Sequence, residues 1–337
     1  MEEARQRGHV AQQAHPARSL VYGPVPSRRL GASLGVDVVP LKVCSYDCIY
    51  CQLGPTRTLT TERSQFFPVG TILAEVERRL RLWPPPDVIT LAGSGEPTLY
   101  AGIGALIEGI KKITSTRVAL LTNGALFHRA DVRAEAAHAD IVLPSLDAGD
   151  EAMFSLVNRS APGLTLGTVV DGLSTFRREY GGEIWLEVMV VAGINDTPRQ
   201  ILPITRLASR IAPDRVQLNT PVRPTFDERA VPVPTARLAD LAGLFSPTAE
   251  VVVERTELSD GGAERRAPEA LEVLELLRRR PCTLEDIATG LSLHANAVVK
   301  TLADLVHRGE VHRILRDGKV FWRTIAEPSC PTGKGGR

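Results

Sequence analysis

Three closely spaced cysteines carry the chemistry that this sequence indicates most clearly. Cys44, Cys48 and Cys51 fall within eight residues in a C-x₃-C-x₂-C spacing, in a predicted loop after a predicted strand. They could be buried thiols or three ligands of a zinc ion, but structural zinc sites usually have four protein ligands, and Cys282 and Cys330 are distant in sequence. Three thiolates on one tight loop suit three irons of a [4Fe–4S] cube, which leaves the fourth iron open for a small molecule.

This motif resembles the signature of the radical S-adenosylmethionine (SAM) superfamily, in which an aromatic residue precedes the third cysteine, as Tyr50 does here. The resemblance implies one [4Fe–4S] cluster on the three cysteines, S-adenosylmethionine bound to the open iron through its amino and carboxylate groups, and Tyr50 near the adenine. One electron from an external flavodoxin- or ferredoxin-like donor would cleave the C–S bond, giving methionine and a 5′-deoxyadenosyl radical that abstracts hydrogen from a substrate. The reactivity belongs to the cofactors, while the protein orients them and excludes water.

A turn after the second predicted strand resembles the superfamily's Gly-Gly-Glu motif. It contains Gly93, Ser94, Gly95 and Glu96. In the superfamily, the backbone and the glutamate of this motif receive the amino group of the methionine moiety. Small residues let a strand end approach a ligand closely, and a carboxylate pairs with an ammonium. The alternative is an ordinary turn between a strand and a helix.

Four further candidates follow later strands. The resemblance places Asn123 at the ligand carboxylate, and Ser145 and Asp147 near the ribose and the carboxylate. It places Ile194 against the adenine. The alternative for the polar residues is Asx or Ser turn chemistry. All these segments fall at the carboxyl ends of predicted strands, where the active sites of α/β barrels lie. No residue is assigned to act on the substrate itself.

Strand patterns alternate with helical patterns through most of the chain, which predicts parallel strands with helices packed outside. The right-handed crossover rule allows an α/β barrel or a doubly wound sheet, and the resemblance implies a partial (β/α)6 TIM-like barrel over residues 20–256. The predicted strands are 34–39, 87–92, 117–122, 140–146, 183–191, 215–219 and 250–254. The predicted helices are 69–82, 103–113, 128–137, 164–180, 198–211 and 234–244.

Residues 23–31 and 217–224 resemble a subgroup related to the wyosine-forming tRNA enzymes, which build a tricyclic base from methylguanosine and pyruvate. That resemblance covers about residues 22–226. Those enzymes hold a second cluster on upstream cysteines, and this chain has no cysteine before Cys44. We therefore do not transfer the pyruvate chemistry, and the substrate stays open among a tRNA base, a peptide and a small metabolite.

Four basic residues are expected near the mouth of the predicted barrel: Arg28, Arg29, Lys42 and Arg223. They could bind the phosphate or carboxylate of an anionic substrate. They could equally be surface charge or a brace for the N-terminal segment. The sequence leaves both interpretations open.

A different pattern follows a predicted linker at 257–266. Helices are predicted over 268–280, 284–291 and 295–308, and a hairpin joins 311–315 to 319–324. Thr283 is the predicted N-cap of the second helix, and Cys282 is predicted to be a small core residue. This order predicts a winged helix-turn-helix domain over 267–326, which could recognise a protein or peptide, bind nucleic acid or act as a structural cap. Its balanced charge gives no clear basic face.

Charge and hydropathy narrow the class of protein, although they exclude few binding partners. The chain has 40 Lys and Arg against 39 Asp and Glu, a net charge of +1, which removes the easiest argument for nucleic-acid binding. No run is apolar enough for a membrane span, and the N-terminus lacks the apolar core of a signal peptide. We expect a cytoplasmic protein without a disulfide framework, with disordered tails at 1–19 and 327–337. The alternative to an enzyme is an iron–sulfur redox sensor acting through the winged helix.

Overall fold

The computed structural model describes residues 19–82, 84–225, 227–252, 270–291, 293, 295–316 and 318–325. The predicted linker at 257–266, the predicted tail at 327–337 and all but Ser19 of the predicted tail at 1–19 lie outside these residues. The predicted domain boundaries that fall there stay predictions. Among the described residues, no helix has the length and apolar character needed to cross a membrane.

An eight-stranded sheet organises the larger part of the chain, in the order β1-β2-β5-β6-β7-β8-β9-β10. From β2 to β10 every neighbouring pair is parallel, and β1 joins the edge antiparallel to β2. The sequence therefore predicted a mostly parallel α/β sheet correctly. The strands are β1 (Val21–Ser27), β2 (Gly31–Val36), β5 (Val88–Leu91), β6 (Arg117–Thr122), β7 (Ile141–Pro144), β8 (Glu183–Met189), β9 (Arg215–Asn219) and β10 (Glu250–Val251).

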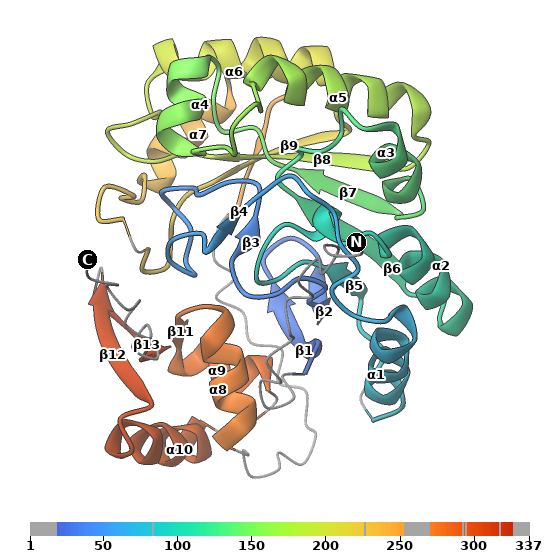
Figure 1. Ribbon diagram of the computed structural model, residues 1–337. Helices are drawn as coiled ribbons and strands as arrows, with labels where there is room; N and C mark the ends of the chain where they lie inside the picture. The colour runs from blue at the N-terminus through green and yellow to red at the C-terminus, as the bar shows by residue number, and fades with distance from the viewer. Residues whose placement is uncertain are drawn as a thin grey trace, which may run out of the picture.

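Helices connect the parallel strands and form an arc outside the sheet (Figure 1). They are α1 (Val69–Leu82), α2 (Ile103–Ile113), α3 (Ala130–Ala136), α4 (Glu151–Val157), α5 (Leu166–Glu179), α6 (Pro198–Ile211) and α7 (Thr235–Ala242). The bounds of α1, α2 and α6 are those that the apolar periodicity predicts. These helices bury one apolar stripe each against the sheet, which is the arrangement that a 3.6-residue repeat specifies.

The two faces of the sheet pack differently. On β8, the side chains of Ile184 and Leu186 belong to the main core beneath the helices. Trp185, between them, packs instead with Val88 and Ile141 on the opposite, inner face. This alternation follows from the two-residue repeat of a strand, and it leaves the inner face to support the loops at the carboxyl ends of the strands.

Three strands of the larger part of the chain escape prediction from sequence, one at the edge of the large sheet and two beside the cysteine loop. β1 contains Pro24 and Pro26, which remove ladder donors and are tolerated at a sheet edge, and its register shifts between Tyr22 and Val25. The short strands β3 (Val43–Cys44) and β4 (Thr58–Leu59) pair in parallel on either side of the cysteine loop. Each of these two strands has two residues, too few to show a periodic pattern.

The C-terminal unit has its own sheet and core. It contains α8 (Ala270–Arg279), β11 (Cys282–Thr283), α9 (Leu284–Gly290), α10 (Ala295–His307), β12 (Val311–Arg316) and β13 (Lys319–Thr324), with an antiparallel sheet in the order β11-β13-β12. Thr283 and Asp286 form a capping box at the start of α9, as the predicted N-cap requires. Cys282 is fully buried, as predicted. The helices and the hairpin match the prediction, and β11 is an addition to it.

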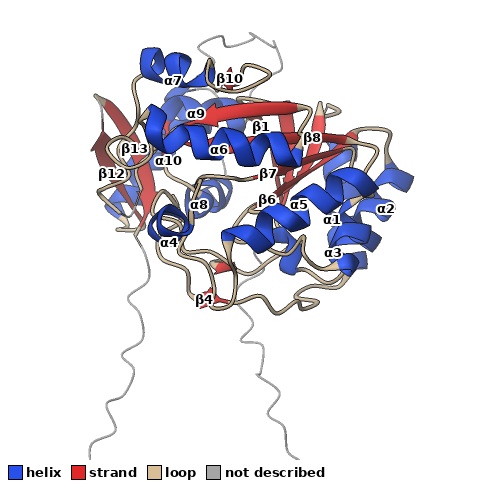
Figure 2. Cartoon of the chain, turned by 90° about the horizontal axis from the view of Figure 1, so that it is seen from above, coloured by secondary structure: helices blue, strands red, loops and turns tan. Residues whose placement is uncertain are grey.

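The C-terminal unit lies beside the edge strand β1 in both views (Figures 1 and 2). Val25 of β1 is part of the buried cluster of the unit, together with Leu276 and Ile287. Arg316 of β12 also donates to the carbonyl oxygens of Arg223 at 3.3 Å and Ala230 at 2.6 Å, in the loop after β9. The unit is therefore packed against the larger part of the chain by both apolar and polar contacts.

Candidate active site

The cysteine loop is held against the end of α4. The backbone N–H groups of Asp47 and Ile49 donate to the carbonyls of Asn158 and Val157, each at 3.0 Å. Tyr46 is buried and packs edge-on against Phe154 of α4, with 5.4 Å between ring centroids. These contacts fix the backbone on which Cys44, Cys48 and Cys51 are placed.

Each of the three sulfur atoms has a nitrogen donor beside it. Asn123 Nδ2 lies 3.6 Å from Cys44 Sγ, and Asn158 Nδ2 lies 3.7 Å from Cys48 Sγ. Lys42, whose side chain is buried, places Nζ 3.0 Å from Cys51 Sγ. Donors to sulfur stabilise the thiolate form and tune an iron–sulfur centre. The loop therefore places one nitrogen donor beside each sulfur, where it would stabilise a metal-bound thiolate.

Burial opposes thiolate formation unless a cation is present. Desolvation, with the nearby Glu96 carboxylate second, raises the pKa of Cys44 to about 12. Desolvation also raises the pKa of Cys48 well above its ordinary value. A metal centre supplies the missing positive charge, because a coordinating thiol loses its proton outright. Half-buried thiols with donors at every sulfur thus fit the ligand set of a metal cluster.

The same residues fit a single metal ion poorly. Within the part of the chain that the structure describes, no three Cys, His, Asp or Glu side chains converge on one metal position. A zinc site needs such convergence, usually of four protein ligands. In a [4Fe–4S] cube, each cysteine binds a different iron, so the sulfurs stand apart. The preference for a cluster rests on the ligand count, since three cysteines are one ligand short of a usual structural zinc site.

The turn at 93–96 braces the cysteine loop through its backbone. Lys42 N donates to Ser94 O at 2.7 Å, and Glu96 N donates to Val43 O at 3.1 Å. A Cβ on Gly95 would overlap the Val43 carbonyl, so only glycine allows this approach. The two segments that the sequence analysis proposed for cofactor binding are therefore in direct contact.

Ser94 and Gly93 face a buried carboxylate that the sequence analysis did not single out. Asp37, just after β2, accepts hydrogen bonds from Ser94 N at 3.1 Å and Ser94 Oγ at 2.6 Å. A Cβ on Gly93 would come within 2.6 Å of Asp37 Oδ1, and the φ of Gly93 is +134°. Asp37 thus holds both the N–H and the hydroxyl of Ser94, while the Ser94 carbonyl oxygen accepts from Lys42 N.

Glu96 is buried, and its two oxygens are used unequally. Oε1 accepts from Thr98 N at 3.0 Å, Thr98 Oγ1 at 2.6 Å and Thr122 Oγ1 at 2.6 Å, while Oε2 accepts from Asn123 N at 2.7 Å. Burial raises the pKa of Glu96, and the hydrogen bonds from Asn123 and Thr122 act against that rise. A carboxylate oxygen has about two acceptor sites, so Oε2 retains capacity for an ammonium donor.

A second polar network lies on the Cys48 side of the loop. Asp147 Oδ2 accepts from Tyr50 Oη at 2.5 Å and from Asn158 Nδ2 at 2.7 Å. Asp147 Oδ1 accepts from Met189 N at 2.8 Å, and Asn195 Nδ2 donates to the Asp147 carbonyl at 2.9 Å. The candidates Tyr50 and Asp147 are therefore hydrogen-bonded to each other. The side-chain amide of Asn158 links the Asp147 carboxylate to Cys48.

The remaining candidates lie close to these networks. Ser145, the residue after β7, is half-buried and forms a parallel bridge with Glu187 of β8. Ile194 and Tyr50 both pack against one buried cluster that contains Ile49 and Val191. The structure therefore brings Ile194 to the cysteine side of the sheet, although its contact with adenine stays a prediction.

The four basic candidates have different surroundings. Lys42 contacts Cys51, whereas Arg29 pairs with Glu187 and Arg223 pairs with Asp286 of α9 at 3.4 Å. Burial, followed by the neighbouring charge of Arg28, lowers the pKa of Arg29 to about 10. Of the four, Lys42 belongs to the cysteine site, and Arg223 joins the C-terminal unit to the rest of the chain.

A cavity of about 450 Å³ opens beside two of the cysteines. Its walls come from the cysteine loop and from the loop after β9, where Asp227 accepts from Arg159 at 2.7 Å. This volume lies in the range of small-molecule sites. It is lined by Asp47, Cys48, Ile49, Cys51, Gly54, Pro55, Arg159, Asp227, Glu228 and Arg229.

Asp37, Asn158 and Asn195 are the site residues that sequence reasoning missed. Asn195 falls in a strand-end segment that resembles the superfamily, but its neighbour Ile194 was chosen. Asn158 immediately follows α4, a helix that was not predicted. Asp37 carries only the signal of a charged residue in an otherwise apolar run, 36–39.

Comparison with known proteins agrees with this geometry. The model of the radical SAM superfamily matches residues 38–202, which contain the three cysteines, the 93–96 turn and Ile194. A UPF0026 protein from Methanocaldococcus jannaschii is 30% identical over 311 residues, covering 90% of this chain and 95% of that protein. A protein named GTPase Obg from Brachyspira hyodysenteriae is 37% identical over 301 residues, but this chain spans only 44% of its length.

The fold is shared with solved structures, as the following example shows. The structure of TYW1 with a lysine–pyruvate adduct bound has a TM-score of 0.51 and 18% identity, and it covers 68% of this chain and 76% of that chain. At this identity the likeness concerns the fold alone. The family model and the near-complete match to the UPF0026 protein concern the sequence itself. The chain therefore belongs to the UPF0026 family, and its residues 38–202 match the radical SAM superfamily model.

Proposed function

We propose that this protein is a radical SAM enzyme that holds one [4Fe–4S] cluster on Cys44, Cys48 and Cys51 and binds S-adenosylmethionine at the open iron. The observation that carries the proposal is the set of three sulfurs on one loop, each beside a nitrogen donor from Asn123, Asn158 or Lys42. When bound, the two cofactors supply reductive cleavage of S-adenosylmethionine and abstraction of a hydrogen atom from substrate. An external one-electron donor starts each cycle.

The residues of this chain orient the cofactors. Glu96 Oε2 receives the amino group of S-adenosylmethionine, helped by the backbone of Gly93, Ser94 and Gly95. Asn123, Ser145 and Asp147 supply polar contacts to the carboxylate and ribose. Tyr50 and Ile194 flank the adenine, and their shared apolar neighbours keep water away from that side.

The fold that we propose for this chemistry is a partial (β/α)6 barrel with a C-terminal winged helix. The open order of the sheet, in which β1 and β10 are the two ends, supports the first part. Three helices followed by the β12–β13 hairpin support the second. The substrate remains a tRNA base, a peptide or a small metabolite, and the C-terminal unit is a candidate for contact with protein, peptide or nucleic acid.

Electron paramagnetic resonance on the reduced, anaerobically reconstituted protein tests this proposal. Addition of S-adenosylmethionine should shift the cluster signal, because a ligand on the open iron changes its electronic environment. Cys48→Ala should lose the intact cluster, and Cys282→Ala, which removes a buried thiol outside the site, should keep it. A spectrum that S-adenosylmethionine leaves unchanged would contradict the proposal, as would full iron content in Cys48→Ala.

A further inference from the structure

We propose that Arg279 of the C-terminal unit is a positioning residue for S-adenosylmethionine, acting through Asp37 on the turn at 93–96. The inference rests on the proposed function for the identity of the ligand. It assigns to the C-terminal unit a part in cofactor binding, separate from any substrate or partner that the unit contacts.

The connection from Arg279 to the 93–96 turn begins with two buried charges. Arg279 Nε lies 4.0 Å from Asp37 Oδ2, and the two side chains are 5% and 1% exposed. At this burial the attraction between opposite charges is weakly screened by water. Arg279 of α8, in the C-terminal unit, therefore balances the charge of Asp37, which lies next to the 93–96 turn.

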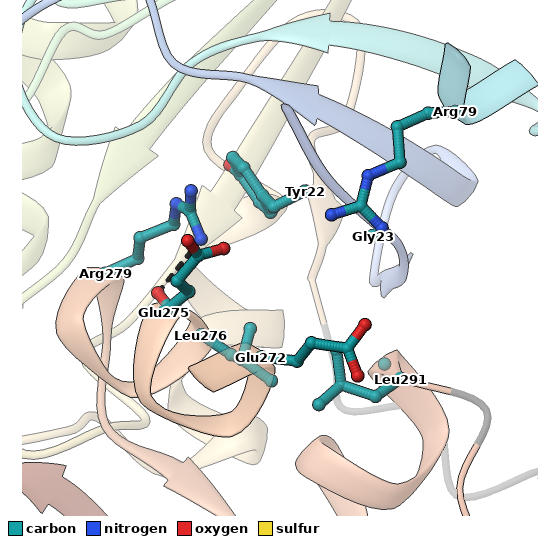
Figure 3. A pocket seen from close by; sticks show the side chains of 9 residues that line it. Tyr22, Gly23, Arg79, Glu272, Glu275, Leu276, Arg279 and Leu291 are labelled. Carbon is teal, nitrogen blue, oxygen red and sulfur yellow. Dashed lines mark hydrogen bonds between the residues drawn. The ribbon is translucent and has the colours of Figure 1, made fainter. Parts of the chain in front are cut away.

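Several contacts fix the guanidinium of Arg279 (Figure 3). Its Nη2 donates to Ser19 O at 2.7 Å, and its Nη1 donates to Glu275 O at 2.9 Å. Its central carbon lies 4.2 Å from the centroid of the Tyr22 ring, a cation–π distance. Arg279 therefore has a fixed position from which to act on Asp37.

From Asp37 the link continues to the cysteine loop without a gap. Asp37 accepts from both the backbone and the hydroxyl of Ser94, and Ser94 O accepts from Lys42 N. Glu96, two residues after Ser94, donates its N–H to Val43 O, next to Cys44. A displacement of Asp37 must therefore move the turn and the start of the cysteine loop together.

The pocket that Arg279 lines is too small for a ligand larger than water. The pocket between β1, α1, α8 and α9 measures about 20 Å³, space for about one water molecule. Tyr22 and Arg79 line it from the larger part of the chain, and Glu272 and Glu275 line it from α8 (Figure 3). The interface thus serves as a packed contact, which suits a positioning role.

Equilibrium dialysis of S-adenosylmethionine against the full-length, cluster-loaded protein tests the inference. Arg279→Gln removes the charge and keeps a donor for Ser19 O, and we expect the dissociation constant to rise roughly 10-fold, as for other outer partners of a site. Arg278→Gln is the matched control, since Arg278 is exposed on the same helix, and it should bind as wild type does. Arg279→Lys, which keeps the charge, should recover most of the affinity.

Hydrogen exchange on the cluster-free protein gives a second readout. The amides of Lys42, Ser94 and Glu96, which close the link, should exchange faster in Arg279→Gln than in wild type or Arg278→Gln. A purely structural role would lower the melting temperature and raise exchange in α8 alone. Wild-type affinity in Arg279→Gln would overturn the inference. If the wild-type protein binds no S-adenosylmethionine, the proposed function fails. In that case, equal exchange rates at these three amides in Arg279→Gln and wild type would overturn the proposed coupling of Arg279 to the 93–96 turn.

Discussion

The two sides of the cysteine loop are held in different ways. On the Cys44 side, the backbone of residues 93–96 lies directly against the loop, and Gly95 leaves no space for a side chain. On the Cys48 side, side chains make the contact, with Asp147 accepting from Tyr50 and Asn158. We call these the glycine wall (residues 93–96) and the carboxylate wall (Tyr50, Asp147 and Asn158). The close backbone contact at Gly95 is lost when a single side-chain atom is added there. The side-chain network, by contrast, can lose one hydrogen bond and keep the others.

The glycine wall should give the largest effect. Gly95→Ala forces a methyl group into the Val43 carbonyl, which should destabilise the fold by about 3 kcal/mol, the upper range for overpacking, and prevent cluster assembly. Gly70→Ala, on α1 with no atom within 4 Å of the added carbon, should be neutral. Urea unfolding and iron content measure both variants. A Gly95→Ala protein with the full iron content of wild type would contradict the proposed difference between the glycine wall and the carboxylate wall.

In the carboxylate wall, Asp147→Asn should rank next. An amide in place of the carboxylate presents hydrogens to at least one of the donors Tyr50, Asn158 and Met189, at a cost of about 1–3 kcal/mol. The cluster should form but be lost more readily to a chelator. Asp240→Asn, at an exposed position on α7, is the control. Equal unfolding midpoints for the two variants would show that the carboxylate is dispensable.

Asn158→Leu tests one bond of the carboxylate wall. Cys48 then loses its nitrogen donor, and we expect cluster affinity to fall roughly 10-fold, as when an outer partner of a metal ligand is removed. Iron retention during a chelator titration measures the effect. Ser155→Ala, exposed on α4, should retain iron as wild type does. Retention by Asn158→Leu at the wild-type level would mean that the donor does not stabilise the cluster.

Tyr50→Phe should give the smallest effect. The ring and its apolar contacts stay, and one hydrogen bond to Asp147 is lost, worth about 0.5–1.5 kcal/mol. Iron content should stay complete, and affinity for S-adenosylmethionine should fall by less than in Arg279→Gln. Equilibrium dialysis of the two variants side by side checks this order. Loss of the cluster in Tyr50→Phe would show that the hydroxyl contributes more than one ordinary bond.

The sequence predicts what depends on local pattern and misses what depends on contact between distant segments. Apolar periodicity gives the bounds of α1, α2 and α6. The cysteine motif gives Tyr50 and a strand-end motif gives Asp147, and a hydrogen bond joins these two residues. Asn158 contacts a cysteine 110 residues away, a pairing that no local pattern contains. The Gly93–Glu96 turn was predicted as a ligand contact, and its role in bracing the cysteine loop becomes visible only when Val43 lies against Gly95.

The C-terminal unit shows the same division. Its helices and hairpin follow from amphipathic pattern and the Thr283 cap. The sequence analysis considered Arg223 as an anion-binding residue or a brace, and the structure pairs it with Asp286. The contact of Arg279 with Asp37 depends on how two units pack, and composition alone cannot predict it.

Formation of 5′-deoxyadenosine tests the central claim most directly. The wild-type protein would be loaded anaerobically with iron and sulfide, reduced with dithionite and given S-adenosylmethionine, and the products would be analysed by mass spectrometry. We expect 5′-deoxyadenosine and methionine from the wild-type protein, and neither from the variant with alanine at Cys44, Cys48 and Cys51. Equal amounts from both proteins would contradict the assignment of these cysteines. A further outcome is a protein that holds a complete cluster and still forms no product when candidate substrates are present. That result would contradict the proposal of an enzyme and favour the redox sensor.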